Sequence, residues 1–477
     1  MAMDTTSGGV IQQLFSGLVT LNAELDVVPE VAQSWEVLES GERYVFHLRD
    51  DMHWSDGHPV TAEDFVYAWG RVLNPAIESP NASYLYDIRG ARAYHRGELS
   101  DPSQLGVQAL DPVTLLVALE RPTSYFPQLL TQAPAFPVPR KVVEAHGEAW
   151  TNTEHLVTNG SFRLERWQRG QSMVLARNPE YRGQFTGNVQ EVALMLNLDE
   201  LGEAPALYEA DRLDILHLHT SPEPNRMRQR HAAEYLSGPT LYTQYVGFNA
   251  SQPPFDDVRV RRAFALAADK EYLAGVTLSG YSFPATGGFI PPGMPAHSPG
   301  IGLPYDPERA RRLLAEAGYP DGRDFPVVEG LLGHKEPIMI DLAEQWHESL
   351  GVKVVWKMDD FDLMLDRLDR DPPPLFRMGW HADYPDPDNP LRLGIWTRQM
   401  ARQNETYARL LDEARRITDH PERMRLYQQA DRLLIKEATV VPILYGRQHW
   451  LVKPWVRQFT PSAIYWSFWK DVIIEPH

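Results

Sequence analysis

Apolar and polar residues alternate along the first part of the chain with the two-residue period of a strand that buries one face. In residues 42–49, ERYVFHLR, this alternation places Tyr44, Phe46 and Leu48 on the same side. The same pattern predicts a hairpin in residues 160–176 and a further strand in residues 189–198.

Helical periodicity begins after a clear start signal at Thr61, which is followed by AEDFVYAWGRVL with Asp64 three residues on, as in a capping box. After about residue 240 helical patterns dominate. The clearest has Asp306 as N-cap, Pro307 in the first turn and Gly318 past the end. Further helices are predicted at 256–275, 405–417 and 421–438, with strands at 352–356 and 440–446.

Helices and strands that alternate in this way indicate an α/β fold for the later region. A chain of 477 residues is long enough for two or three domains. No repeat and no low-complexity linker marks a boundary, which suggests that the chain crosses between domains more than once.

Charge and composition narrow the class of partner. A formal net charge of −18, with acidic and basic residues interspersed, argues against nucleic acid or an anionic membrane surface. Cysteine is absent, so disulfides, thiolate metal sites and cysteine nucleophiles are excluded. No apolar run has the length of a membrane helix, and MAMDTTSGGV lacks the features of a signal peptide, so we expect either a cytoplasmic protein or one whose leader was removed.

Catalytic and metal motifs are weak. The sequence has no GxSxG, HExxH, P-loop or strand-linked GxGxxG motif. The pairs His53 with His58 and His217 with His219 could offer metal ligands, but isolated pairs are more often surface or core histidines. We therefore expect no catalytic residue, metal or cofactor.

The segment RMGWHADYPDPDNP, residues 377–390, is the best candidate for ligand chemistry. It places Arg377, Trp380 and Asp383 close together in sequence, and in extended backbone Arg377 and Asp383 are at most about 20 Å apart. That reach could span the ammonium and carboxylate of a short zwitterionic ligand. The alternative is that Asp383 caps a turn, because the trailing PDPDNP is rich in turn-forming residues.

Several segments, taken in order along almost the whole chain, resemble one family. They are LFSGLV at 14–19, YVFHLRDDMHWSDGHPVTAEDFVYAWGRVLNP at 44–75, LGVQALD at 105–111, NGSFRLERW at 159–167, FNASQPPFDDVRVRRAFALAADKE at 248–271, GWHADYPDP at 379–387 and LVKPWV at 451–456. The chain resembles the family 5 extracellular solute-binding proteins of bacterial ABC importers, and within them the oligopeptide binders.

The resemblance implies a two-lobed, periplasmic-binding-protein-like α/β fold (type II, cluster C) with an additional small domain and lobes joined by a hinge. It implies that lobe I comprises 1–16, 141–241 and 448–477, that the extra domain comprises 17–140, and that the second ligand-binding lobe, lobe III, comprises 242–447. Ligand would be enclosed when the lobes close.

The same resemblance implies a peptide held extended as an added strand. Asp383, with Asn81, would bind the peptide ammonium. Arg377, Lys335 and His334 would bind its carboxylate. Main-chain contacts and pocket walls would come from Gly379, Trp380, His381, Tyr245 and Phe361.

Three departures from the family pattern bear on the ligand. Asn81 replaces a tyrosine that helps to hold the ammonium, and Thr277 replaces a lysine that meets the carboxylate of some peptides. The family's N-terminal strand segment that lines the peptide falls at about Met3 to Thr5, where this sequence begins.

The leading hypothesis is a monomeric, non-catalytic binding protein that delivers short peptides to ABC-importer permease subunits, in the periplasm or at the outer face of the cytoplasmic membrane. The alternatives are the same fold with another solute (a dipeptide, murein peptide, nickel chelate, sugar or opine), a ligand-sensing domain, and a metallopeptidase using His53 and His58.

Overall fold

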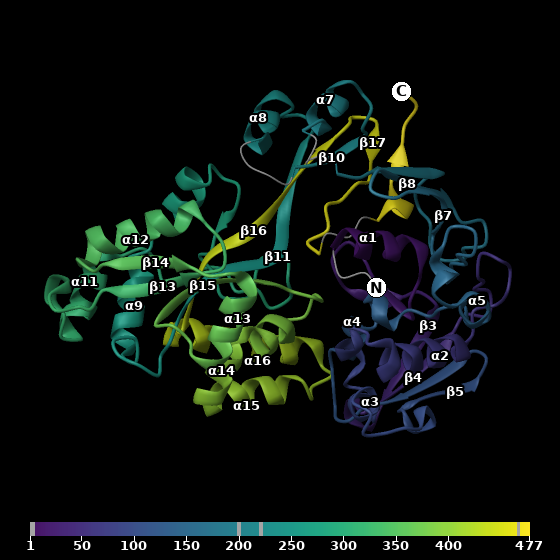
Figure 1. Cartoon of the computed structure of the whole chain (residues 1–477), viewed down its shortest axis with the longest axis horizontal. Helices are drawn as coiled ribbons and strands as arrows, with labels where there is room; N and C mark the ends of the chain where they lie inside the picture. Colours follow the sequence, from purple (N-terminus) through teal and green to yellow (C-terminus); the bar gives the residue numbers. More distant parts are fainter. Residues whose placement is uncertain (1–4, 198–201, 219–222, 465–467) are drawn as a thin grey trace.

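The computed structural model describes residues 5–197, 202–218, 223–464 and 468–477, which form two bodies joined by a pair of long strands (Figure 1). The strands are β11 (Tyr235–Phe248) and β16 (Val440–Val452). They pair antiparallel and run from one body to the other. The boundaries expected near residues 241 and 447 fall inside these two strands.

One body contains a seven-stranded mixed sheet in the order β10-β16-β11-β15-β13-β14, with β12 paired to β16. Strand β13 is parallel to its neighbours β14 and β15, whereas β11 is antiparallel to its neighbours β15 and β16. The remaining strands of this sheet are β10 (Ile215–His217), β12 (Phe283–Pro284), β13 (Val328–Leu332), β14 (Val354–Met358) and β15 (Leu375–His381).

Helices bury both faces of this sheet. Val246 belongs to a core formed with α9, α11 and α12, and the adjacent Tyr245 belongs to a second core formed with α13, α15 and α16. Burial on both sides explains why most of β11 is buried rather than alternating. The helices are α9 (Val258–Leu266), α10 (Lys270–Tyr272), η7 (Leu273–Thr277), α11 (Pro307–Glu316), η8 (Pro320–Gly322), α12 (Pro337–Leu350), α13 (Phe361–Arg370), η9 (Asn389–Leu393), α14 (Ile395–Gln403), α15 (Glu405–Ala414) and α16 (His420–Glu437).

The other body has smaller sheets. A four-stranded sheet has the order β3-β4-β6-β5, a three-stranded sheet has the order β7-β8-β9, and two strand pairs complete it. The strands are β1 (Val19–Leu21), β2 (Val27–Pro29), β3 (Ala32–Leu38), β4 (Arg43–Leu48), β5 (Val107–Asp111), β6 (Thr114–Ala118), β7 (Phe162–Gln168), β8 (Ser172–Arg177), β9 (Glu191–Met195), β17 (Val456–Arg457) and β18 (Ile473–Ile474).

Beside a small separate core that includes Tyr208, Leu216 and Met227, one large hydrophobic core runs through this second body. It includes Phe46 of β4 and Phe65 of α2, and also Phe162 of β7, Leu175 of β8 and Val472 near the C-terminus. The segments assigned to lobe I and to the extra domain are thus packed together. The helices here are α1 (Thr5–Leu14), η1 (Glu39–Gly41), α2 (Ala62–Leu73), η2 (Pro75–Ile77), η3 (Ala82–Leu85), α3 (Ala91–His95), η4 (Pro102–Gln104), α4 (Phe126–Leu129), η5 (Ala133–Ala135), α5 (Arg140–His146), η6 (Gly147–Thr151), α7 (Ala204–Glu209), α8 (Glu223–Arg230) and η10 (Trp469–Asp471).

The structure confirms several of the strands and helices that the sequence predicts. In β4 the residues Tyr44, Phe46 and Leu48 are all buried, as the alternation predicts. The Asp64 carboxylate accepts the Thr61 backbone N–H at 2.8 Å, which forms the expected capping interaction at the start of α2. The hairpin of β7 and β8 is confirmed, as are the helices after Asp306, Asn404 and Asp419.

The predicted single helix at 256–275 is wrong in one respect. The structure divides it into α9, which ends at Leu266, and α10, which begins at Lys270. The Asp269 carboxylate accepts the backbone N–H of Tyr272 at 2.9 Å, so this aspartate starts a new helix instead of continuing the first. A capping residue inside an apolar periodic pattern was the signal for the break.

None of the described helices combines the length and the apolar character that crossing a membrane would require.

Candidate ligand-binding site

The strand β15 provides an open edge at the centre of the candidate site. It pairs with β11 along its whole length, but it pairs with β13 only at Leu375 and Phe376. From Arg377 to His381 the side of β15 away from β11 has no strand partner among the described residues. Backbone N–H and C=O groups on such an edge can pair with an added strand.

Asp383 follows the end of β15 and is exposed. Its Oδ2 accepts a hydrogen bond from Nδ2 of Asn389 at 2.9 Å. The phenol of Tyr84, on η3 in the other body, lies near enough to this carboxylate to interact with it. Burial and then the negative charge of Asp383 raise the pKa of Tyr84, so its hydroxyl stays protonated. The site at Asp383 is thus built from both bodies.

Asn81 lies at the start of the same 3-10 helix and is half-buried. Its backbone oxygen accepts the N–H of Tyr84 at 3.2 Å, so the structure brings Asn81 within one turn of the tyrosine that contacts Asp383. The sequence analysis selected Asn81 and missed Tyr84. The nearby Tyr84 and Tyr86 were visible in the sequence, but nothing in the spacing indicated which side chain turns toward Asp383.

Asn389 is a second positioning residue that the sequence analysis missed. It is fully buried, and its Oδ1 accepts the indole N–H of Trp380 at 2.8 Å while its amide donates to Asp383. One side chain therefore holds both Trp380 and Asp383. The indole of Trp380 also packs against the core beside β15.

The residues expected to bind a carboxylate meet a carboxylate of the protein itself. Nη2 of Arg377 lies 2.5 Å from Oε1 of Glu336, and Nε2 of His334 lies 2.6 Å from the same oxygen. Nε2 of Gln244 donates to the other Glu336 oxygen at 2.9 Å. Lys335 is exposed and has no ion pair among the described residues. Arg377 and His334 are thus brought together, but around Glu336.

Tyr242 is the aromatic residue that organises this part of β15. Its hydroxyl accepts a hydrogen bond from Arg377 at 3.1 Å, and its ring stacks on His381 with centroids 4.2 Å apart. A Cβ added to Gly379 would lie 2.1 Å from the Tyr242 hydroxyl oxygen, so glycine is required where the ring crosses the strand. Gly379 and His381, both predicted site residues, therefore share one neighbour.

The structure places Tyr245 differently from the expectation of a pocket wall. Tyr245 is 1% exposed and packs edge-on against Phe289 in the core, because side chains alternate along β11 and this one points to a helix-covered face. Tyr242 is the β11 aromatic that reaches the site instead. Phe361 is 47% exposed at the start of α13, in the neighbourhood of Gly333 and the His334 loop.

The segment after Asp383 was expected to be only a turn, and that expectation is incomplete. The backbone does turn, with Asn389 N–H donating to Asp386 O at 3.0 Å, and Asp386 rather than Asp383 caps it by accepting the Asp388 N–H. Both aspartates are buried. Asp386 pairs with Arg423 at 2.7 Å, and burial raises its pKa while Arg423 lowers it.

Asp388 connects this turn to the other body. Its Oδ2 accepts from Nε of Arg392 at 2.6 Å, and Nη2 of Arg392 donates to the hydroxyl of Tyr125 at 2.8 Å. Tyr125 belongs to the body that contains α4, and it stacks on Tyr384 at 5.9 Å. The turn therefore anchors the Asp383 loop where the two bodies touch.

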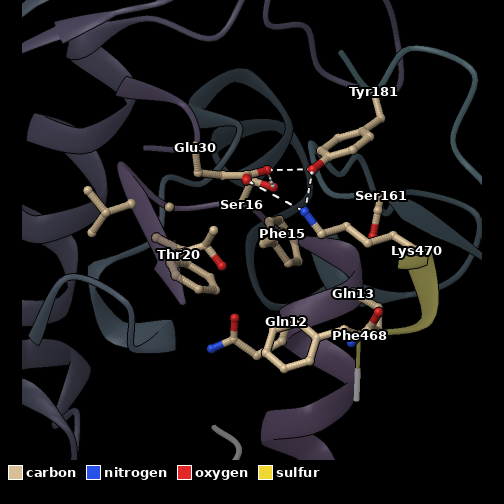
Figure 2. Close-up of a pocket in the computed structure, with 13 residues that line it drawn as sticks. Gln12, Gln13, Phe15, Ser16, Thr20, Glu30, Ser161, Tyr181, Phe468 and Lys470 are labelled. Carbon is tan, nitrogen blue, oxygen red and sulfur yellow. Dashed lines mark hydrogen bonds and ion pairs between the residues drawn. The ribbon is translucent and has the colours of Figure 1, made fainter. Parts of the chain in front are cut away.

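A small hollow lies in the body that contains α1 (Figure 2). In Figure 2, Tyr181, Ser16 and Lys470 converge on the carboxylate of Glu30, at 2.6, 3.1 and 3.9 Å. This carboxylate is saturated by donors from three distant segments, and none of the predicted ligand residues lines the hollow. We assign it a structural role in joining the C-terminal segment to β2.

No three histidine, aspartate or glutamate side chains in the described part of the chain are grouped to hold a metal ion. Nδ1 of His53 interacts with Asp51 O at 2.8 Å, and His58 lies 3.2 Å from Asp56. His217 stacks on Trp450. His219 and Met3 lie outside the described residues, and Thr5 begins α1.

Two lobes joined by paired strands, with an open strand edge and a charged group at each end, define a two-lobed ligand-binding protein. The model for bacterial extracellular solute-binding proteins, family 5 (Middle), matches residues 26–395. The chain belongs to this family.

Relatives and solved structures agree with this assignment. The chain is 34% identical to the probable deoxycholate-binding periplasmic protein YgiS of Escherichia coli (strain K12), over 99% of this chain and 90% of that protein. It is 32% identical to the periplasmic oligopeptide-binding protein OppA of the same organism, over 94% of this chain and 85% of that protein. The solved structures that the chain resembles are two-lobed periplasmic binding proteins of the OppA type, as the sequence resemblance predicted.

The arrangement of the two bodies resembles that of an unliganded open binding protein more than that of a peptide complex. The TM-score is 0.89 with the unliganded open form of the murein tripeptide-binding protein MppA, at 28% identity over 100% of this chain and 94% of that one. It falls to 0.71 with Haemophilus influenzae OppA in complex with RPPGFSPFR, also at 28% identity, over 100% of this chain and 96% of that one.

Proposed function

We propose that this chain is the solute-binding component of an ABC importer and captures short peptides in extended form between its two lobes. The observation that carries the proposal is the edge of β15 from Arg377 to Trp380, which has no strand partner in the part of the chain that the structure describes and leads to the Asp383 carboxylate. A peptide main chain can pair with that edge whatever its side chains are, and its ammonium can reach Asp383.

The proposed sites follow from this placement. Asp383, with Tyr84 and the neighbouring Asn81, binds the ammonium. Gly379, Trp380 and His381 offer main-chain contacts and walls, with Phe361 nearby. Arg377, His334 and Lys335 form the other end. A buried or half-buried ammonium without a partner costs several kcal/mol, so Asp383 sets the register of the ligand.

Hinge closure is the proposed mechanism. Lobe I comprises 1–16, 141–241 and 448–477, the extra domain comprises 17–140, and lobe III comprises 242–447, so β11 and β16 carry the hinge. Similarity to an unliganded open form supports an open state that admits ligand. The closed state is the one that the permease accepts.

We also propose an oligomeric state, a set of partners and a location for the protein. The protein acts as a monomer without catalysis or cofactor, does not bind nucleic acid, and works with permease subunits in the periplasm or at the outer face of the membrane. Several of its relatives are periplasmic peptide-binding proteins, which supports this location.

Thermal unfolding with added peptides tests the proposal. A mixture of peptides of two to five residues should raise the melting temperature, because a ligand at 100 times its Kd stabilises a protein by about 2.7 kcal/mol. Asp383→Ala should abolish the rise, and N-acetylated peptides should not produce it. Asp412→Ala, at an exposed position of α15, is the matched control. A well-folded sample that no peptide stabilises contradicts the proposal.

A second candidate is the same fold with a solute other than a peptide. The 34% identity to a protein named for deoxycholate binding supports this second candidate. Mass spectrometry of small molecules that copurify with the protein from the native host distinguishes the two. Peptides released on denaturation support the first candidate, and a steroid acid or another non-peptide solute supports the second.

A further inference from the structure

At the Arg377 end of the proposed site, the carboxylate of Glu336 already pairs with the arginine. Arg377 is 8% exposed, and its guanidinium contacts Glu336 at 2.5 Å and the Tyr242 hydroxyl at 3.1 Å. The Glu336 side chain is itself only 13% exposed. The positive charge expected to receive a ligand carboxylate is therefore already compensated within the protein.

Glu336 is held firmly in this position. Three donors reach its two oxygens: Arg377, His334 and Gln244. It also stands at the N-cap position of α12, a helix of 14 residues, where the partial positive charge of the helix end favours a carboxylate. Gln244 comes from β11 and Arg377 from β15, so two strands and one helix fix the side chain.

A ligand carboxylate at this end would meet two obstacles. It would have to displace Glu336 from its donors, or lie beside a like charge in a partly dehydrated place, where repulsion is much stronger than in water. Lys335 offers little compensation, because an exposed and hydrated ammonium contributes weakly to an ion pair. A neutral amide or a cationic group meets neither obstacle.

We infer that Glu336 determines specificity by taking the place of the ligand's acid, so that the ligand has a free amine at the Asp383 end and no carboxylate at the Arg377 end. The inference rests on the proposed function and narrows it to peptides or amines that are amidated, blocked or cationic at the far end. With carboxylates at Asp383 and Glu336 and one compensated arginine, the site favours a ligand of net positive charge. The net charge of −18 would speed the arrival of such a ligand.

Paired peptides test this inference. A set of two- to five-residue peptides with free amines, each made as the C-terminal acid and as the C-terminal amide, is titrated by calorimetry into the wild type and into Glu336→Gln. The wild type should bind the amide at least tenfold more tightly than the acid. Glu336→Gln should gain at least tenfold in affinity for the acid and so lose the preference for the amide.

Glu329→Gln is the matched control, because Glu329 lies on β13 nearby and its side chain is 59% exposed and paired with Lys357. It should leave the acid-to-amide ratio unchanged. The melting temperature of each unliganded variant shows whether it is folded, and Glu336→Ala provides a second variant that removes the carboxylate.

The possible results distinguish a failure of this inference from a failure of the proposed peptide binding. The inference is overturned, and the proposed peptide binding is not, if the wild type binds acids and amides with equal affinity. The same holds if neither Glu336→Gln nor Glu336→Ala changes the ratio of the two affinities. If neither form of any peptide binds the wild type or the variants, peptide capture itself is wrong, and the inference is overturned with it.

Discussion

The phenol of Tyr84 lies close enough to the carboxylate of Asp383 for that carboxylate to raise its pKa, although the two residues belong to different bodies of the protein. This proximity brings η3 to the loop that follows β15. Close by, Arg392 donates to the hydroxyl of Tyr125 and makes a second contact between the same two bodies. Residues of both bodies therefore contribute to the ammonium end of the proposed site.

Tyr84→Phe should weaken the binding of peptides with a free amine about tenfold, which corresponds to about 1.4 kcal/mol. The variant loses a hydroxyl beside the Asp383 carboxylate, but that carboxylate stays exposed to water, so the stability of the unliganded protein should change little. Calorimetric titration measures the effect. Tyr86→Phe, two residues away and half-buried, is the control. Equal affinities for the Tyr84 variant and the wild type would contradict this role.

Asn389→Ala should lower both stability and affinity. The change leaves the indole N–H of Trp380 without its acceptor and removes a donor to Asp383, and an unsatisfied partly buried group costs about 1–3 kcal/mol. Urea denaturation measures the first effect and calorimetry the second. Asn404→Ala separates a general loss of stability from an effect on the site, because Asn404 caps α15 and has no part in the site.

Gly379→Ala should destabilise the protein by about 1–3 kcal/mol, because the new methyl group must displace the Tyr242 ring. Movement of that ring also disturbs its hydrogen bond with Arg377 and its stacking on His381. Gly70→Ala in α2 is a strong control, since a Cβ there meets nothing within 4 Å and alanine favours a helix. We expect Gly70→Ala to raise the melting temperature, and a neutral Gly379→Ala would show that the ring is not fixed.

Asp431 should make stability depend on pH. Burial raises the pKa of this carboxyl to about 7, and the backbone N–H groups of Phe289 and Ile290 lower it only in part. Because the folded-state pKa lies above the unfolded one, the stabilisation is fully present below about pH 4 and is lost as the pH rises to about 7. The total change is about 4 kcal/mol.

Asp431→Asn should flatten that profile, since the amide oxygen can still accept the Phe289 N–H without ionising. Urea unfolding of both proteins between pH 4 and pH 8 measures the difference in slope. Profiles that remain parallel would show that Asp431 ionises in the folded protein with an ordinary pKa.

Local chemistry made much of the fold predictable. The Thr61 and Asp64 pair and the Asp306 and Pro307 pair predicted helix starts, because a cap is completed within a few residues. The alternation through Tyr44, Phe46 and Leu48 predicted β4, since one face of its sheet is buried. The same logic failed at Asp269, where a cap interrupted a pattern that otherwise reads as one helix.

The site was less predictable, because its contacts join residues far apart in the sequence. Asp383 and Arg377 were identified from their own segment and from the family resemblance. Tyr84, Asn389 and Glu336 were not identified, since nothing near them in sequence shows which carboxylate or donor they meet. Tyr245 was placed in a pocket, and the direction of its side chain on a doubly covered strand put it in the core.

The sequence by itself determined the family, the α/β character and the loop that carries Asp383. Helix caps, the alternation of apolar and polar residues, and family motifs each lie within a short stretch of chain. Only the tertiary structure decided which partners the charged side chains meet. Asp383 lies near Tyr84 of the other body, and Arg377 pairs with Glu336. Pairing depends on which side chains meet when β11, β15 and α12 pack together, and that arrangement is set by the whole fold.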